Sequence, residues 1–267
     1  MPLPYDYSAL DHPRVLPVLF HPRRDYGEPT PKASALDLMI PAGDRISIGA
    51  CFHIRDTRSP CILFFHGNGE IVSDYDEFGE LYNSVGLNLL VVDYRGYGRS
   101  TGNPSVSNMM RDCHDIFNFT HRFLEEKGCP GPLIVMGRSI GSASALELAA
   151  SYPDRMNGLI IESGFAHAAP LIKLLGIDPD SIGFREKKGF GNVDKIRKWT
   201  GPTLIIHGEL DHMIPFSDGR TLFDACGSSD KRLLKIPGAG HNDLFIREMS
   251  MYMEGVKTMA DRISQGH

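Results

Sequence analysis

The sequence lacks the features that mark several classes of protein. No apolar run approaches the roughly 18 residues needed to cross a bilayer. A signal peptide begins with a positively charged segment, and the first six residues include no lysine or arginine. Basic residues are outnumbered by acidic ones, 28 to 33, so the net charge of −5 provides no electrostatic attraction for nucleic acid. We therefore expect a cytoplasmic protein with no integral membrane segment and no nucleic-acid partner.

Metal-binding and disulfide patterns are also missing. The five cysteines are widely spaced and form no C-x-x-C pair. Cys51, Cys61 and Cys113 lie in apolar or helical segments, where reduced, packed thiols are expected. The eleven histidines include no H-E-x-x-H pattern. We predict that the protein binds no metal.

What the sequence does contain is an alternation of apolar strand-like runs and helical segments. Several of the runs are continuous stretches of β-branched or aromatic residues, as expected of parallel strands covered on both faces. We predict strands at 36–40, 45–54, 61–65, 88–92, 133–136, 158–162, 203–207 and 232–236. We predict helices at 75–84, 106–127, 140–151, 216–225 and 244–263. The predicted fold is a single α/β domain over residues 1–267, with an eight-stranded, mostly parallel open sheet and helices on both faces.

Two segments stand outside the alternation. The first 33 residues are rich in proline and charge and are predicted to form an irregular arm that wraps the surface. Between Glu162 and Pro202 no strand is evident, and the segment carries apolar residues at Leu171, Leu175 and Phe184. Ligands of α/β sheets bind at the carboxyl ends of the strands. We therefore interpret residues 164–200 as a lid, the alternative being a subdomain that only packs on the sheet.

Ser139 lies at the centre of Gly137-Arg138-Ser139-Ile140-Gly141, between a predicted strand and an Ala-rich helix. A strand, a sharp turn and a helix with serine at the apex form the G-x-S-x-G nucleophile elbow. The turn strains the serine so that its hydroxyl projects above the sheet. Side chains at 137 and 141 would collide where strand and helix approach each other, which explains both glycines. We predict that Ser139 is a nucleophile.

A serine nucleophile requires a base and an acid, and in elbow hydrolases they follow in the order acid, then histidine. We predict that His241 is the base. It lies between the last predicted strand and helix, in Gly238-Ala239-Gly240-His241-Asn242. Asp211 follows the seventh strand, and we predict that it is the acid. Three other carboxylates are possible: Glu162, which ends the sixth strand, Glu209, and Asp243, whose position favours helix capping.

The oxyanion of an acyl-transfer reaction needs backbone donors. One is expected at Ile140, the residue after the nucleophile, and the other in the loop after the third strand. That loop reads His66-Gly67-Asn68-Gly69, and we predict the N–H of Asn68, with Gly69 as the less favoured donor.

A second glycine-rich block follows the fourth strand, where Gly96, Gly98 and Gly102 could suggest a dinucleotide loop. The spacing is not G-x-G-x-x-G, and Pro104 delays the helix that would hold a pyrophosphate. We predict no cofactor, and a structural role for Asp93 and Arg95 in the loop beneath the site.

Together these segments resemble the α/β-hydrolase fold family from about Leu36 to the C-terminus. The pattern is most similar to the BEM46/ABHD13-like branch, whose members share H-G-N, D-Y-R-G-Y-G-x-S-x-G and G-R-S-I-G. This branch includes palmitoyl-protein thioesterase-like enzymes, and many members carry an N-terminal transmembrane anchor, which has no counterpart in this sequence.

From the residues and the resemblance we expect a serine hydrolase that cleaves a carboxylic ester or thioester of a small molecule through an acyl-enzyme on Ser139. The apolar residues of the lid suggest short or medium acyl chains. Two alternatives remain open: an amidase or peptidase that uses the same triad, and a non-catalytic binding protein on the same fold.

Overall fold

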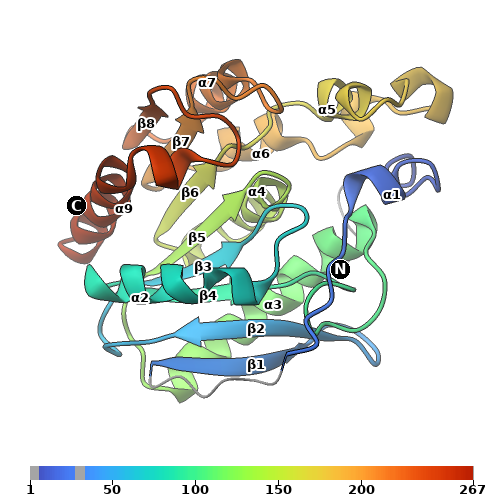
Figure 1. Cartoon of the computed structure of the whole chain (residues 1–267). Coiled ribbons are helices and arrows are strands. Elements are labelled where there is room, and N and C mark those ends of the chain that lie inside the picture. Colours follow the sequence, from blue (N-terminus) through green and yellow to red (C-terminus); the bar gives the residue numbers. More distant parts are fainter. Residues whose placement is uncertain (1–5, 28–33, 267) are drawn as a thin grey trace.

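The computed structural model describes residues 6–27 and 34–266, and its centre is one eight-stranded sheet (Figure 1). The strand order is β1-β2-β4-β3-β5-β6-β7-β8; β2 pairs antiparallel with β1 and β4, and the strands from β4 to β8 run parallel. The strands are β1 (Ala35–Pro41), β2 (Ser47–His53), β3 (Cys61–Phe65), β4 (Asn88–Val92), β5 (Leu133–Arg138), β6 (Gly158–Glu162), β7 (Thr203–Gly208) and β8 (Lys231–Ile236). The structure confirms the predicted α/β-hydrolase fold.

Helices cover both faces of the sheet, with α2 in front of it and α3 behind it in Figure 1. The main helices are α2 (Asp76–Ser84), α3 (Val106–Glu126), α4 (Gly141–Ser151), α6 (Asn192–Lys198), α7 (Phe216–Ala225) and α9 (Met249–Ser264). Shorter ones are α1 (Leu16–Leu19), α5 (Ala168–Leu174) and α8 (Leu244–Arg247). Among the described residues, no helix has both the length and the apolar character needed to cross a bilayer.

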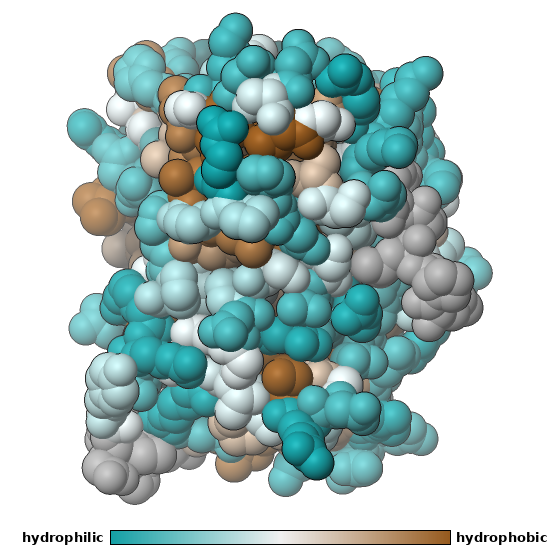
Figure 2. Space-filling model, turned by 90° about the vertical axis from the view of Figure 1, so that its right-hand side faces the viewer, coloured by the Kyte–Doolittle hydropathy of each residue, from teal (hydrophilic) through white to brown (hydrophobic). Residues whose placement is uncertain are grey.

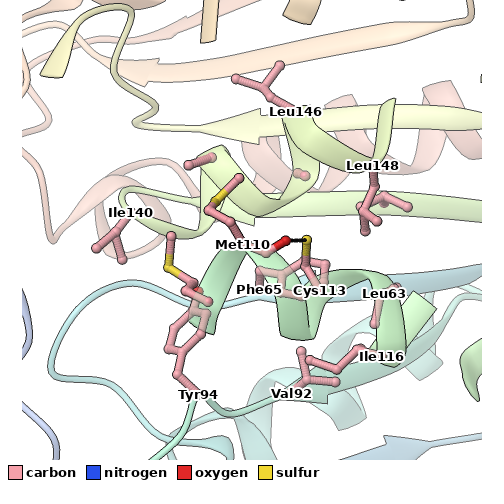
Figure 3. Packing of buried hydrophobic residues seen from close by; sticks show 14 of the residues in the cluster. Leu63, Phe65, Val92, Tyr94, Met110, Cys113, Ile116, Ile140, Leu146 and Leu148 are labelled. Carbon is pink, nitrogen blue, oxygen red and sulfur yellow. Dashed lines mark hydrogen bonds between the residues drawn. The ribbon is translucent and has the colours of Figure 1, made fainter. Parts of the chain in front are cut away.

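Alternate residues of each central strand supply two separate cores. Ile62 and Phe64 of β3 pack with residues of α2 and α9, whereas Leu63 and Phe65 pack with α3 and α4. This alternation follows from the two-residue repeat of a strand, and it explains why the central strands are apolar throughout. In Figure 3, Met110 and Cys113 of α3 lie beside Phe65 of β3 and Leu148 of α4 points toward Leu63, whereas Leu146 lies on the opposite side of α4. The helix that follows the elbow is therefore fixed by packing on all sides.

Two predictions about the chain ends are wrong in part. The predicted helix 244–263 is broken at Glu248, whose φ of −142° and ψ of 58° end α8 before α9 begins. The apolar pattern continues through the break, so sequence periodicity does not reveal it. The arm over residues 1–33 is not merely a surface strap. Within its described part, Leu10 and Val15 are fully buried and α1 forms one helical turn.

The segment after β6 contains α5, α6 and two short 3₁₀ turns, Pro179–Ile182 and Glu186–Lys188. Glu186 holds the N-terminus of α5, because its carboxylate accepts hydrogen bonds from the backbone N–H groups of Ala168 and Ala169 at 2.8 and 2.9 Å. Phe184 and Phe190 are buried and belong to the same core cluster as residues of β3, α3 and α4. The segment is thus ordered and packed against the rest of the domain.

Candidate active site

Ser139 occupies the turn between β5 and α4 with a φ of 52°, a left-handed conformation rare for residues other than glycine. Its N–H donates to the carbonyl of Glu162 on the neighbouring strand at 2.9 Å. Its carbonyl accepts from the hydroxyl of Ser142 at 2.6 Å. The surrounding hydrogen bonds therefore hold the strained residue in place.

The two glycines of the elbow are required by different contacts. A Cβ atom at Gly137 would lie closer than 3.0 Å to the backbone of Gly141 at the start of α4. A Cβ atom at Gly141 would instead approach the backbone of Phe65 at the end of β3 within the same limit. Backbone atoms cannot move aside as a flexible side chain can. The first collision is the one expected from the sequence, and the second involves a strand more than seventy positions upstream.

Three predicted site residues form a continuous chain of hydrogen bonds. Oγ of Ser139 lies 3.0 Å from Nε2 of His241, and Nδ1 of His241 lies 2.7 Å from Oδ2 of Asp211. All three residues are less than a tenth exposed. Ser139 and His241 are 102 positions apart in the sequence, and the parallel sheet brings them together at the carboxyl ends of β5 and β8.

Asp211 is held by its own loop as well as by the imidazole. Its Oδ1 accepts the N–H groups of Met213 and Ile214 at 2.9 and 2.8 Å. Burial raises its pKa, but the hydrogen bonds from His241 and Ile214 outweigh this effect, so the pKa lies below the usual 3.8. The carboxylate is ionised at neutral pH and fixes the tautomer of His241 with the proton on Nδ1.

The neighbouring carboxylates have other partners. Glu209 accepts a hydrogen bond from Lys235 at 2.6 Å, and Asp243 accepts one from Arg247 at 2.8 Å. Asp243 is the residue at which α8 begins, as its position suggested, but its side chain makes no capping hydrogen bond to the helix, and its other oxygen accepts the N–H of Gly240 at 2.6 Å. It therefore shapes the loop that carries His241.

Arg138 connects the site loops, and sequence analysis did not single it out. Nη2 donates to the carbonyl of His241 at 2.9 Å and to Oδ1 of Asn242 at 3.0 Å. Nε donates to Glu162 at 3.2 Å, and Nη1 pairs with Glu70. The arginine lies beside the nucleophile in the elbow, but nothing in the local pattern indicates that it is buried.

The charged groups around Arg138 change one another's pKa values. Burial lowers the pKa of Arg138, but Glu70 and Glu162 raise it more, so it remains above its ordinary value. Burial raises the pKa of Glu70, yet Arg138 brings it below its ordinary value. For Glu162, burial outweighs Arg138 and its pKa is raised. Glu162 is thus part of this network, whereas Asp211 contacts the imidazole.

The loop after β3 presents Asn68 close to the elbow. Its side-chain Oδ1 accepts the N–H of His21 at 2.8 Å and the hydroxyl of Tyr97 at 2.7 Å. Among the described residues, neither the backbone N–H of Asn68 nor that of Ile140 has a hydrogen-bond acceptor. Both donors are thus available to a ligand.

In the glycine block after β4, the missing side chain of Gly98 leaves space for the side chain of Asp93. A Cβ atom at Gly98 would collide with the carboxylate of Asp93, which also accepts the N–H of Val72 at 3.0 Å and lies 3.2 Å from Nε2 of His66. Arg95 forms two hydrogen bonds of 2.6 Å to Asp112. These contacts agree with a structural role for the block.

One group of potential metal ligands is present in the described part of the chain. Cys51, His53 and Asp76 place their ligand atoms within 4.8 Å of one another between β2 and the start of α2. The grouping was not visible in the sequence because Asp76 comes from a separate element. These residues also take part in other interactions. The absence of a bound metal stays a prediction.

Two hollows border the loops that carry the candidate site residues. One, of about 140 Å³, lies between α5 and the loop that carries Asp211, and its walls are mostly apolar. The other, of about 180 Å³, is lined by aromatic side chains together with Arg138, Glu70, Glu162 and His241. Another hollow, of about 980 Å³, lies near the amino end of β5 and includes none of the candidate site residues.

The upper part of the molecule exposes apolar side chains beside the first hollow. Leu174 of α5 is 56% exposed and Met213 of the aspartate loop 46%. Figure 2, which faces the side where α1 and α5 lie in Figure 1, shows hydrophobic residues gathered in its upper part on a mostly hydrophilic surface.

Known proteins resemble this chain in sequence and in structure. Residues 57–177 match the family model described as serine aminopeptidase, S33. The chain is 32% identical over 242 residues to alpha/beta hydrolase domain-containing protein 17B of Xenopus laevis, covering 88% of this chain and 78% of that protein. It is 29% identical over 225 residues to protein bem46 of Schizosaccharomyces pombe, covering 80% and 74%. The esterase Pf2001 of Pyrococcus furiosus superposes with a TM-score of 0.71 at 16% identity, covering 90% of this chain and 98% of the other. The chain belongs to the α/β-hydrolase family and is related to its BEM46-like branch.

Proposed function

We propose that the protein is a serine hydrolase that cleaves a carboxylic ester or thioester through an acyl-enzyme on Ser139. The observation that carries the proposal is the unbroken relay from the Ser139 hydroxyl through His241 to Asp211, with distances of 3.0 and 2.7 Å. A relay with these distances and this chain order is the arrangement that activates a serine hydroxyl.

The proposed reaction has two halves. Nε2 of His241 takes the hydroxyl proton while Oγ of Ser139 attacks the carbonyl carbon. The same proton then passes to the leaving alcohol or thiol as its bond to carbon breaks. A water molecule next gives a proton to His241 and attacks the acyl carbon, and Ser139 recovers its proton as the acid departs. Asp211 stabilises the imidazolium in both halves.

The N–H groups of Ile140 and Asn68 are the proposed oxyanion donors. Two features support this assignment. Both groups lack an acceptor within the described chain. In addition, the side chain of Asn68 is held by His21 and Tyr97, which fixes the loop before any substrate binds. Donors fixed in advance stabilise developing charge most effectively.

We propose that residues 164–200 act as a lid and that the hollow beneath α5 receives the acyl chain. Its walls include Phe165, Leu171, Leu174, Met213 and Ile214. Its volume of about 140 Å³ is small compared with the roughly 300–1,000 Å³ of sites for drug-sized ligands. Such a space favours short or medium acyl chains over long ones.

A fluorophosphonate probe tests the nucleophile directly. We expect stoichiometric labelling of the purified protein at Ser139 and none in Ser139→Ala. Replacing Ser139 or His241 by alanine should reduce kcat for a nitrophenyl ester by about four to six orders of magnitude. Labelling that persists in Ser139→Ala would disprove the assignment.

The description of the matched family favours one second candidate, an amide-cleaving enzyme with the same triad. A panel of matched ester, thioester and aminoacyl amide substrates separates the two. We expect kcat/KM for the ester and thioester to exceed that for the amide, and the reverse order would support a peptidase. A folded protein inert to all three and to the probe would indicate a binding protein.

A cytoplasmic location remains part of the proposal. No disulfide joins any of the five cysteines, all of which are buried, as expected for a reducing compartment. Fractionation of cells that express the full chain provides the test, with recovery in a membrane pellet as the contrary result.

A further inference from the structure

Arg138 extends from the elbow to the loop that carries the proposed base. It is the residue before Ser139, and its side chain is 11% exposed. Nη2 binds the backbone carbonyl of His241 itself, at 2.9 Å, and the side chain of Asn242 at 3.0 Å. One nitrogen thus links the strand end that carries the nucleophile to the backbone of the base.

The same guanidinium extends to the proposed oxyanion loop. Nη1 pairs with Glu70, whose Oε2 accepts the N–H of Gly67 at 2.6 Å and the hydroxyl of Tyr75 at 2.5 Å. A Cβ atom at Gly67 would collide with Nη1 of Arg138, so the loop packs directly against the guanidinium. Gly67 immediately precedes Asn68.

We propose that Arg138 is a positioning residue that holds the base loop and the oxyanion loop in register with Ser139. The inference rests on the proposed function of these loops. A guanidinium is planar and carries five donors in fixed directions, so it can set the distance between two loops that follow β3 and β8, which are not neighbours in the sheet. Catalytic groups need positions held to within about 0.5 Å.

Stability alone does not explain this network. Burying three charges costs free energy, and apolar residues of similar volume stabilise a protein as well or better. What apolar residues cannot provide is direction. The donors of Arg138 face the two loops in question and, through Nε, Glu162 at the end of β6.

The chain contains a matched control in Arg95. It forms a buried pair with Asp112, with two hydrogen bonds of 2.6 Å, and its side chain is 14% exposed. Asp112 belongs to α3, so this pair joins the loop after β4 to a helix that carries none of the candidate site residues. Loss of either arginine removes a buried ion pair, but only Arg138 contacts the base loop.

The first experiment compares Arg138→Met with Arg95→Met. We expect Arg138→Met to reduce kcat for a nitrophenyl ester about 100-fold, with KM changed less than about threefold, because misplacement of about 1 Å is sufficient for such a loss. The rate of fluorophosphonate labelling should fall in parallel. Arg95→Met should lower the melting temperature while kcat changes less than about threefold. Arg138→Lys, which retains the charge without the fork, should lie between wild type and Arg138→Met.

The second experiment attempts chemical rescue. The 180 Å³ hollow is lined by Arg138, Glu70 and Glu162, so a small cation can enter the space vacated by the arginine side chain. We expect millimolar guanidinium chloride to raise the kcat of Arg138→Ala at least about tenfold. It should not raise the kcat of Arg95→Ala. If Arg138→Met and Arg138→Ala fail to fold, Asn242→Ala tests the positioning role instead. This substitution removes one contact between Arg138 and the base loop and leaves the ion pairs of Arg138 intact, so we expect kcat to fall about tenfold.

The outcomes separate the two proposals. A folded Arg138→Met that keeps kcat within threefold of wild type, or an Arg95→Met that loses kcat equally, would overturn the positioning role while wild type is still labelled at Ser139. Wild type that is not labelled would overturn the proposed function, and the positioning role with it.

Discussion

The carboxylate of Glu162 accepts a hydrogen bond from the hydroxyl of Tyr252 at 2.7 Å. Its other oxygen accepts a hydrogen bond from Nε of Arg138 at 3.2 Å. Asp211 instead places one oxygen 2.7 Å from Nδ1 of His241. Glu162 ends β6 and Asp211 follows β7, and both are candidates for the acid by chain order. Their side-chain partners differ, and so do the effects expected from neutralising them.

Asp211→Asn should reduce kcat by about four orders of magnitude, because the amide favours the wrong tautomer of His241. Glu162→Gln should reduce kcat by about tenfold at most, since it disturbs only a partner of Arg138. Steady-state rates with a nitrophenyl acetate series measure both. Equal losses in the two variants would contradict the choice of Asp211.

The elbow glycines are predicted to tolerate no side chain. Gly137→Ala should lower kcat below about 1% of wild type and destabilise the fold by about 1–3 kcal/mol, because the new methyl group meets the backbone of Gly141. Urea unfolding and ester turnover provide the two measurements.

Gly128→Ala is the control for this prediction. Gly128 has a φ of +64°, and a Cβ atom there would meet nothing within 4 Å, so only backbone strain of about 1 kcal/mol is expected. Its kcat should remain that of wild type. A Gly137→Ala enzyme as active as Gly128→Ala would refute the steric argument.

The hollow beneath α5 predicts a change in chain-length preference. Leu171→Trp should fill it and lower kcat/KM for hexanoate esters at least about tenfold, while acetate esters change less than about threefold. Met39→Trp, at a 48% exposed site on β1, serves as the matched control and should alter neither. A uniform loss across all chain lengths would argue against an acyl site here.

His207 predicts a loss of stability in mild acid. It is fully buried, and its Nε2–H donates to the carbonyl of Ile214 at 2.8 Å. Burial holds its pKa below the ordinary 6.5. The unfolded chain therefore binds a proton near pH 6.5 and the folded chain only at lower pH, so the stabilisation is complete above pH 6.5 and is lost as the pH falls below it.

Urea unfolding between pH 7 and pH 5 checks this prediction. The free energy of unfolding of wild type should decrease by up to about 1.4 kcal/mol per pH unit from this group. His207→Gln should show a shallower slope, and other titrating groups, such as His121, contribute equally to both proteins. Parallel slopes would contradict the role of His207.

Much of the fold was predictable because its signals are local. Continuous apolar runs mark the strands, and glycine, proline and asparagine mark the turns between them. The break at Glu248 was not predictable, because the apolar pattern continues from α8 into α9 through the break. The burial of Leu10 and Val15 in the arm was missed because their neighbours in sequence are charged and proline-rich.

The sequence by itself determined which segments carry the serine, the aspartate and the histidine, because an elbow and its loops are defined by short-range steric and turn chemistry. Only the tertiary structure decided which carboxylate lies beside the imidazole and that Arg138 contacts the backbone of His241, 103 positions away. These contacts depend on the register of parallel strands and on burial within the folded sheet. Both arise from the packing of distant segments, which no local pattern encodes.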